Sequence, residues 1–348
     1  MTMLRKSLLR KSLLSKSLMP ALALAALAGS STGPARAQET LTLGLPAIPP
    51  VFVSVQAYVA LQEKLFEKHG VKVIMRPFDS GANAARATVA GDVDFAISPT
   101  PLIVNMISNA NAELVGIYGY EHPDWLLGSM DPTKKCEDIK GQPVGVDSEG
   151  GARSIALNQL IRSCGLTAKD TQQVALSSNV GTAMASGQLN WGVLHIDDVP
   201  IIERQAGKKV ATILDINKVA PLNHYMTIVT TREKADKKKE ALTRALAAMI
   251  EAVAFIYDPK NADAVAKAAE PTGRDADEAR TSTKMYTAMN FWPRQGMGLP
   301  QKNIDEIIET QKKVGGIRAN ATPVTYERFA NPTIYNDALK MTGGGKTN

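Results

Sequence analysis

One pattern occurs twice in the sequence: a run of small residues typical of a helix, a glycine that would end this helix, and an apolar run typical of a strand. The first copy occupies residues 84–97 and the second residues 181–194, and Gly187 of the second copy follows Gly91 of the first by 96 positions. Glycine suits the left-handed conformation that commonly ends a helix, and the apolar run after it predicts a buried strand. Two copies predict two related α/β domains with a cleft between them. Ligand binding is therefore the first functional hypothesis.

Residues 1–37 have the pattern of a secretory signal peptide. A basic segment precedes an apolar stretch at 18–28, and Ala35-Arg36-Ala37 offers a cleavage site before Gln38. We expect cleavage after Ala37 and a soluble protein in the periplasm. An uncleaved membrane anchor is the alternative, but spanning a bilayer needs about 20 apolar residues.

The charge balance changes once this segment is set aside. The whole chain has 40 basic and 34 acidic side chains, and six of the basic ones lie in residues 1–37. The remaining 311 residues therefore carry 34 charges of each sign. Nucleic-acid binding proteins usually show a basic excess, so no nucleic-acid partner is expected. We expect a monomer.

Cys136 and Cys164 are the two cysteines of the chain. A strand near 143–146 leads away from Cys136, and a helix of about fourteen residues from Gly151 returns roughly 20 Å at 1.5 Å per residue. An oxidising compartment then makes a disulfide possible. Two buried free thiols are the alternative, because spacing alone does not fix the separation of the Cα atoms.

Strands and helices alternate along the chain, which predicts two doubly wound α/β domains with parallel sheets. The chain should cross between them twice and end in a helical C-terminal part. We expect a discontinuous first domain, 38–127 and 221–348, and a second domain, 128–220. The expected strands are 41–45, 71–75, 93–97, 114–118, 125–130, 144–146, 173–176, 191–195, 210–213 and 224–230.

Four segments carry a resemblance to a known family: Gly91-Asp92-Val93-Asp94-Phe95-Ala96, Gly141-Gln142-Pro143-Val144-Gly145-Val146, Ser186-Gly187-Gln188-Leu189-Asn190 and Asp258-Pro259-Lys260-Asn261-Ala262. The chain resembles periplasmic substrate-binding proteins of ABC importers with the type II fold, in the group that binds nitrate, sulfonates, taurine and thiamine-pyrimidine precursors. The resemblance implies a receptor that takes a small organic molecule, such as a sulfonate or aromatic carboxylate, and delivers it to a permease in the inner membrane.

Two departures from the family pattern bear on the ligand. Asn190 stands where an aspartate is usual, and His195-Ile196-Asp197-Asp198 replaces the Trp-Glu-Pro stretch of the sulfonate branch.

Ligands of open α/β sheets bind beyond the carboxyl ends of the strands, near helix N-termini. Turns at these places give the candidate ligand-binding residues. They are Ala47, Phe52, Asp79, Ser98, Thr100, Ser148, Glu149, Gly150, Arg153, His195, Asp197 and Tyr225.

Each candidate also has a simpler structural interpretation. Ser98 and Thr100 could hold an oxyanion or could only cap a helix. Arg153 could pair with a carboxylate or sulfonate, or could be solvated. Acidic residues in the same turns argue against a highly charged anion such as sulfate. Aromatic residues could stack on a flat ligand or belong to the core; they are Phe52, Phe78, Tyr120, Trp125 and Tyr225.

Enzyme functions have weaker support in the sequence. Ser148 lies on a strand-to-helix turn, but the turn lacks the first glycine of a nucleophile elbow, so a hydrolase is disfavoured. A pyrimidine-synthase-like enzyme would share the scaffold, but the chain has no cysteine-rich motif. The histidines are not paired at metal-ligand spacing, and only His195 with Asp197 or Asp198 is locally plausible. We expect no catalysis, no cofactor and no metal.

Overall fold

The computed structural model describes residues 38–219, 226–294 and 298–343. These residues belong to one compact unit, Gln38–Asn348. The expected signal peptide, its cleavage site and Tyr225 lie outside the described residues. Within the described ranges, no helix has the length and apolar character needed to cross a bilayer.

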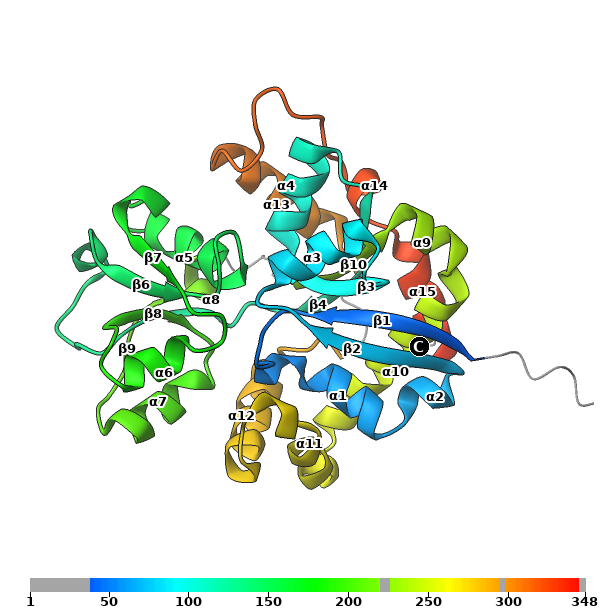
Figure 1. The fold of residues 1–348 in the computed structure, drawn as a ribbon, viewed down its shortest axis with the longest axis horizontal. Coiled ribbons are helices and arrows are strands. Elements are labelled where there is room, and N and C mark those ends of the chain that lie inside the picture. Colours follow the sequence, from blue (N-terminus) through cyan, green and yellow to red (C-terminus); the bar gives the residue numbers. More distant parts are fainter. Residues whose placement is uncertain (1–37, 220–225, 295–297, 344–348) are drawn as a thin grey trace, which may run out of the picture. The chain divides into compact units, whose positions relative to one another are not determined.

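Within the described residues, ten strands form two sheets of five strands each (Figure 1). The first sheet has the order β2-β1-β3-β10-β4, built from β1 (Glu39–Leu45), β2 (Val71–Pro77), β3 (Phe95–Pro99), β4 (Leu114–Glu121) and β10 (Met226–Thr231). The second has the order β7-β6-β8-β5-β9, built from β5 (Leu126–Ser129), β6 (Pro143–Val146), β7 (Gln172–Ala175), β8 (Trp191–Leu194) and β9 (Ala211–Asp215).

The expected α/β fold class is confirmed, but the expectation of parallel sheets is wrong, because both sheets are mixed. β10 runs antiparallel to β3 and β4, and β5 runs antiparallel to β8 and β9. Parallel neighbours need a crossover connection within one sheet. β5 instead follows β4 of the other sheet after residues 122–125, and β10 is likewise the first strand after the chain leaves the second sheet. The strand 126–129 lies wholly in the second sheet.

The repeated sequence pattern occupies the same place in both sheets. α3 (Gly81–Ala90) ends at Gly91, whose φ of 89° is left-handed, and β3 follows as the third strand of its sheet. α6 (Val180–Ala185) is followed by Gly187, with a φ of 77°, and β8 is again the third strand. The sequence repeat thus corresponds to a repeat of topology.

Helices cover both faces of the first sheet, and residues of β3 alternate between the two layers. Phe95 and Ile97 pack into the core cluster formed with α1 (Val55–Gln62), α10 (Lys239–Tyr257) and α15 (Pro332–Met341). Ala96 packs into the opposite cluster with α3, α4 (Thr100–Ala110) and α13 (Gln301–Lys313). This period of two is what a strand buried on both faces requires.

Residues 54–69, whose apolar positions have the spacing of a single helix, form shorter helical pieces. A 3₁₀ turn, η1 (Phe52–Ser54), precedes α1, and α2 (Leu65–Lys68) begins after Lys64, whose φ is 53°. The three apolar positions that predicted a helix, Val55, Val59 and Phe66, are nevertheless all buried. The hydrophobic spacing therefore located the buried face but not the break.

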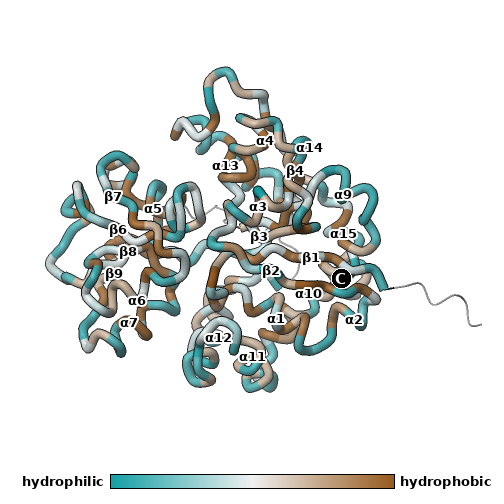
Figure 2. Tube along the Cα trace, in the orientation of Figure 1, coloured by the Kyte–Doolittle hydropathy of each residue, from teal (hydrophilic) through white to brown (hydrophobic). Residues whose placement is uncertain are grey.

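The second sheet is also covered on both faces. α5 (Ala152–Arg162) and α8 (Ile216–Val219) pack on one side, and α6 with α7 (Asp198–Ala206) on the other. Gly145 and Gly192 allow α6 to lie close, because a Cβ atom at either position would come 2.7 Å from Val180 Cγ1. Figure 2 shows hydrophobic residues along the strands and hydrophilic ones on the outer turns of α7.

The remaining helical segments complete these layers. Cys136 in η2 (Cys136–Ile139) is joined by a disulfide to Cys164, which follows α5, with the Cα atoms 6.2 Å apart. The other segments are η3 (Ala168–Asp170), α9 (Arg232–Lys237), η4 (Pro259–Asn261), α11 (Ala262–Ala268), η5 (Glu270–Thr272), α12 (Ala276–Ala288) and α14 (Tyr326–Phe329).

Candidate functional site

A hollow lies where the carboxyl ends of strands from both sheets meet. About 400 Å³ of it is free of atoms, part of this being open solvent, and about 30 Å³ is wide enough for a water molecule. One or two waters would fill such a space. Its walls are Pro46, Ala47, Val51, Val53, Ile97, Tyr120, Glu121, Trp125 and Met226 from the first sheet and its outgoing connection, and Asp147, Ala152, Arg153, Ser177, Ser178 and His195 from the second.

Ser177 connects the two sides of this hollow. It follows β7 with a left-handed φ of 51°. Its hydroxyl oxygen lies 3.0 Å from the carbonyl oxygen of Ile48 and 2.9 Å from that of Asp79, so its one proton serves either acceptor. Both carbonyls belong to turns that follow strands of the first sheet. A loop of the second sheet is thereby held against the first.

Arg153, in the first turn of α5, is buried and paired. Its guanidinium donates to the carbonyl of Val193 and lies 3.4 Å from the Asp198 carboxylate. It also lies over the ring of Trp125, 5.3 Å from the centroid. Because the residue is only 2% exposed, the solvated alternative for Arg153 does not hold.

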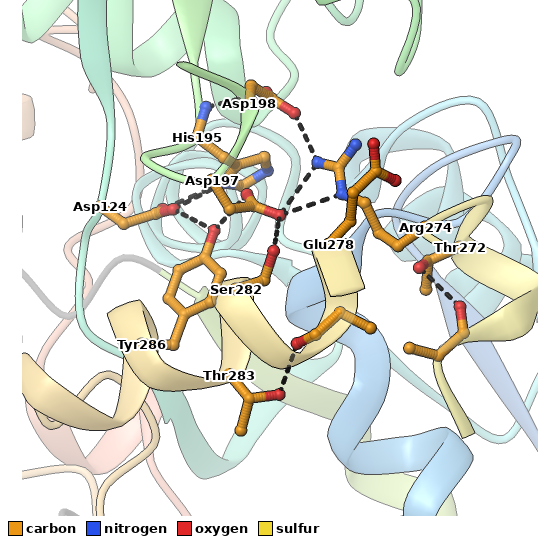
Figure 3. A network of polar contacts seen from close by, with 12 residues as sticks. Asp124, His195, Asp197, Asp198, Thr272, Arg274, Glu278, Ser282, Thr283 and Tyr286 are labelled. Atoms are coloured by element: carbon orange, nitrogen blue, oxygen red, sulfur yellow. Dashed lines mark hydrogen bonds and ion pairs between the residues drawn. The ribbon is translucent and has the colours of Figure 1, made fainter. Parts of the chain in front are cut away.

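His195 is held by an acid and an aromatic ring. Its Nδ1 lies 2.9 Å from the Asp124 carboxylate, and its ring centroid is 4.0 Å from that of Trp125. The hydroxyl of Tyr286 lies 2.8 Å from Asp124 and 2.7 Å from Asp197, so its proton serves one carboxylate at a time (Figure 3). Burial raises the pKa of the Tyr286 phenol well above its usual value.

An ion-pair network extends from this histidine to the start of α12. Arg274 precedes α12, and its Nη2 donates to Asp197 at 2.9 Å and to Asp198 at 2.8 Å, while Ser282 donates to Asp197 at 3.1 Å (Figure 3). Burial disfavours the ionised Asp198, but the charges of Arg153 and Arg274 outweigh this and lower its pKa. These contacts join the N-terminus of α7, in the second sheet's layer, to a helix that packs with the first.

Glu121 is the exception in this paired environment. It ends β4, is 1% exposed and lines the hollow. Among the residues that the structure describes, its Oε2 atom has no hydrogen-bond partner. Burial, helped by the nearby charge of Asp124, raises the pKa of Glu121 well above its usual value.

Asp147 is the second cavity carboxyl with a raised pKa, again because of burial. Unlike Glu121, it has partners. It accepts hydrogen bonds from the backbone N–H groups of Arg153 at 3.1 Å and Ser154 at 3.3 Å, at the N-terminus of α5.

We expect Glu121→Gln to make folding stability less sensitive to rising pH. A carboxyl whose pKa is higher in the folded than in the unfolded protein favours folding below its unfolded pKa, and this contribution falls as pH rises toward the folded pKa. The slope approaches about 1.4 kcal/mol per pH unit for one group. Glutamine cannot ionise and does not lose this contribution. Urea unfolding between about pH 5 and pH 8 should therefore show that the free energy of unfolding of the variant rises relative to that of the wild type.

Glu113→Gln is the control for this measurement, because Glu113 precedes the same strand and its side chain is 72% exposed. The stability of the Glu113→Gln variant should depend on pH in the same way as the stability of the wild type. Parallel curves for Glu121→Gln and the wild type would contradict the assigned burial effect.

The sequence-predicted residues are only partly gathered at the hollow. Ala47, Arg153 and His195 line it, as do the aromatic candidates Tyr120 and Trp125. Asp197 lies in the adjoining ion-pair network.

Other predicted residues lie away from the walls. Ser98 donates to the carbonyl of Gly81 at 2.9 Å, and the Thr100 hydroxyl lies 2.6 Å from that of Thr227, so neither hydroxyl caps α4 or reaches the hollow. Phe52 is buried and stacks on Tyr286.

The turn before α5 carries three more predicted residues. Ser148 has a buried hydroxyl, Glu149 is exposed, and Gly150 is left-handed with a φ of 68°. Asp79 contributes a backbone carbonyl to the contact with Ser177.

Several polar residues of the site were not anticipated. They are Glu121, Asp124, Ser177, Ser178, Arg274, Ser282 and Tyr286. Two acids within the four residues 121–124, directly after an apolar strand, were a usable signal for part of this set. Arg274 and Tyr286 come from the helical C-terminal part and gave no local signal.

Comparisons with known proteins identify the family of the chain. Residues 52–262 match the model of the family described as NMT1/THI5 like. The chain belongs to this family. A protein of Brucella abortus (strain 2308), whose name designates a binding protein, is 25% identical over 199 residues, which are 57% of this chain and 61% of that protein. The match thus spans about three fifths of the length of this relative.

Solved structures share the fold of this family member. The nitrate-binding protein NrtA of Synechocystis PCC 6803 has a TM-score of 0.69 at 12% identity, covering 87% of this chain and 88% of its own. The alkanesulfonate-binding protein SsuA of Xanthomonas axonopodis pv. citri, solved with MOPS, has a TM-score of 0.64 at 14% identity, covering 80% and 94%. The fold is that of the periplasmic binding proteins.

Proposed function

We propose that the protein is the extracytoplasmic ligand-binding component of an ABC importer, which binds a small organic molecule and presents it to a membrane permease. The observation that carries this is the hollow, whose walls come from the carboxyl ends of strands in both sheets. Ligands of such folds bind at this position. Membership of the NMT1/THI5-like family and the fold shared with SsuA and NrtA support the same function.

The proposal includes location and assembly. We propose export to the periplasm with cleavage after Ala37, and a monomer with domains 38–127 plus 221–348 and 128–220. The 30 Å³ open to water is far below the roughly 300 Å³ or more of ordinary ligand pockets. An organic ligand therefore enters only if the two sides separate, and binding then favours closure because the ligand contacts both.

The hydrolase alternative has little geometric support. The Nδ1 atom of His195 is paired with Asp124. The Ser148 hydroxyl has no hydrogen-bond partner among the described residues. A nucleophilic serine needs a base within hydrogen-bond reach.

The decisive experiment is a thermal-shift screen of the purified protein, followed by calorimetry. The panel should contain aliphatic sulfonates, aromatic carboxylates, amino acids and pyrimidines. A ligand at 100 times its Kd adds about 2.7 kcal/mol to the free energy of unfolding. Mass spectrometry should recover the bound ligand unchanged. A ligand altered by the wild type, but not by Ser148→Ala, would favour the hydrolase.

We expect Arg274→Ala to open the ligand-free protein and to weaken ligand binding several-fold. Arg274 lies just before α12 and pairs with Asp197 and Asp198 at the N-terminus of α7, so its loss removes a contact that holds the closed form. A loss of about 1.4 kcal/mol shifts the open-to-closed ratio tenfold. Small-angle scattering should show a larger radius of gyration.

Arg280→Ala is the matched control for this variant. Arg280 pairs with the exposed Asp263 and Asp277, both outside the second sheet's layer. It should leave the scattering curve unchanged. If the two variants scatter alike, Arg274 does not hold the closed form.

A further inference from the structure

We propose that Glu121 is the anchoring residue for the ligand and that it receives a positively charged nitrogen, such as an ammonium or amidinium group. This inference rests on the proposed function, since it specifies the chemistry of the molecule that enters the same hollow. A cationic ligand would distinguish this protein from receptors that bind simple anions.

The position of Glu121 gives the first part of the argument. It is the last residue of β4, opposite Met226 of β10, and both residues line the hollow. At 1% exposure, Glu121 is shielded from bulk water, and its Oε2 atom has no partner among the described residues. Leaving a buried polar atom unpaired costs about 1–3 kcal/mol, and more for a charge. A ligand group that pairs with this oxygen removes that cost.

The other carboxyl groups around the hollow already have partners. Arg274 pairs with Asp197 and Asp198, and Arg153 also contacts Asp198. Asp124 pairs with His195 and Tyr286, and Asp147 with the backbone N–H groups that begin α5. Among the wall residues that the structure describes, Glu121 is thus the carboxyl with an oxygen left for a ligand.

The balance of charge decides between a cationic and an anionic ligand. Two carboxyl groups line the hollow, Glu121 and Asp147, and three more lie in the adjoining network, Asp124, Asp197 and Asp198; the cationic side chains among them are those of Arg153 and Arg274, beside the imidazole of His195. Both arginines are committed to carboxylates of this set. An anionic ligand would find both arginines already paired and would disfavour ionisation of Glu121 further, whereas a cation beside Glu121 favours the ionised carboxylate and pairs with it.

The second side of the hollow offers a complementary polar group. Ser178 follows β7 and lines the same space, and its buried hydroxyl has no hydrogen-bond partner within the described part of the chain. A ligand that pairs with Glu121 and Ser178 contacts both sheets at once. Such a ligand binds the closed form in preference to the open one.

The test uses a bacterial small-molecule extract separated into cation-exchange, anion-exchange and unretained fractions. Each fraction is added to the wild type, to Glu121→Gln and to the control Glu113→Gln, and the melting temperature is recorded. We expect the cation-exchange fraction to stabilise the wild type and Glu113→Gln but not Glu121→Gln. For the compound then purified from that fraction, Glu121→Gln should raise the Kd at least about 30-fold, as loss of a buried charge partner does.

The outcomes separate this inference from the proposed function. Stabilisation of the wild type by the anion-exchange or unretained fraction alone would overturn the cationic ligand while leaving a receptor. Equal stabilisation of Glu121→Gln and the wild type by the cation-exchange fraction would overturn Glu121 as the anchor. If no fraction stabilises the wild type, the receptor function itself fails, and this inference fails with it.

Discussion

Replacing Asp197 by alanine is expected to lower the free energy of unfolding by about 3–5 kcal/mol, the usual cost of removing one partner from a buried ion pair. The residue is 1% exposed, and its carboxylate accepts hydrogen bonds from Arg274 at 2.9 Å and Ser282 at 3.1 Å. The Tyr286 hydroxyl also lies 2.7 Å away. Alanine leaves these buried donors with fewer acceptors, and urea unfolding at neutral pH measures the loss.

Two further variants make the Asp197 result specific. Asp263→Ala removes an ion pair with Arg280 in which the aspartate side chain is 90% exposed, and it should cost less than about 1 kcal/mol. Asp197→Asn keeps one acceptor oxygen and should fall between the alanine variant and the wild type. A cost below about 1 kcal/mol for Asp197→Ala would show that the network contributes little to stability.

Much of the fold could be predicted because local patterns report burial directly. Gly91 and Gly187 mark helix ends by their left-handed backbone, and the apolar runs after them are β3 and β8. The antiparallel direction of β5 and β10 could not be predicted in this way. It depends on which sheet a strand joins after the chain crosses over, and the pattern of a strand is the same in either direction.

The site was harder to predict because polar residues pair over long sequence distances. Ser98 lies near the end of β3 and Thr100 begins α4, which is the right local position, but their hydroxyls already bond the Gly81 carbonyl and the Thr227 hydroxyl. Glu121 ends a strand in the same way and has no such partner for Oε2 among the described residues. The local sequence position is similar in both cases. Only tertiary contacts distinguish a polar group that already has a hydrogen-bond partner from one that is left for a ligand.

Loss of the disulfide is expected to lower the free energy of unfolding by roughly 3–4 kcal/mol, from the loop-closure entropy of its span. Cys136 and Cys164 are 28 positions apart, and their Cα atoms lie 6.2 Å from each other. The double variant Cys136→Ser/Cys164→Ser should therefore unfold at a lower urea concentration than the wild type. Alkylation should label the wild type only after reduction.

In this double variant, ligand affinity should change much less than the free energy of unfolding. The bridge joins η2 to the end of α5, and neither cysteine is among the wall residues of the hollow. Arg153, which does line it, lies at the other end of α5 and is fixed by Val193 and Asp198. The Kd of an identified ligand should thus stay within about twofold while the variant is folded. A large loss of affinity without unfolding would mean that the bridge positions α5 for binding, and labelling of the unreduced protein would show free thiols instead.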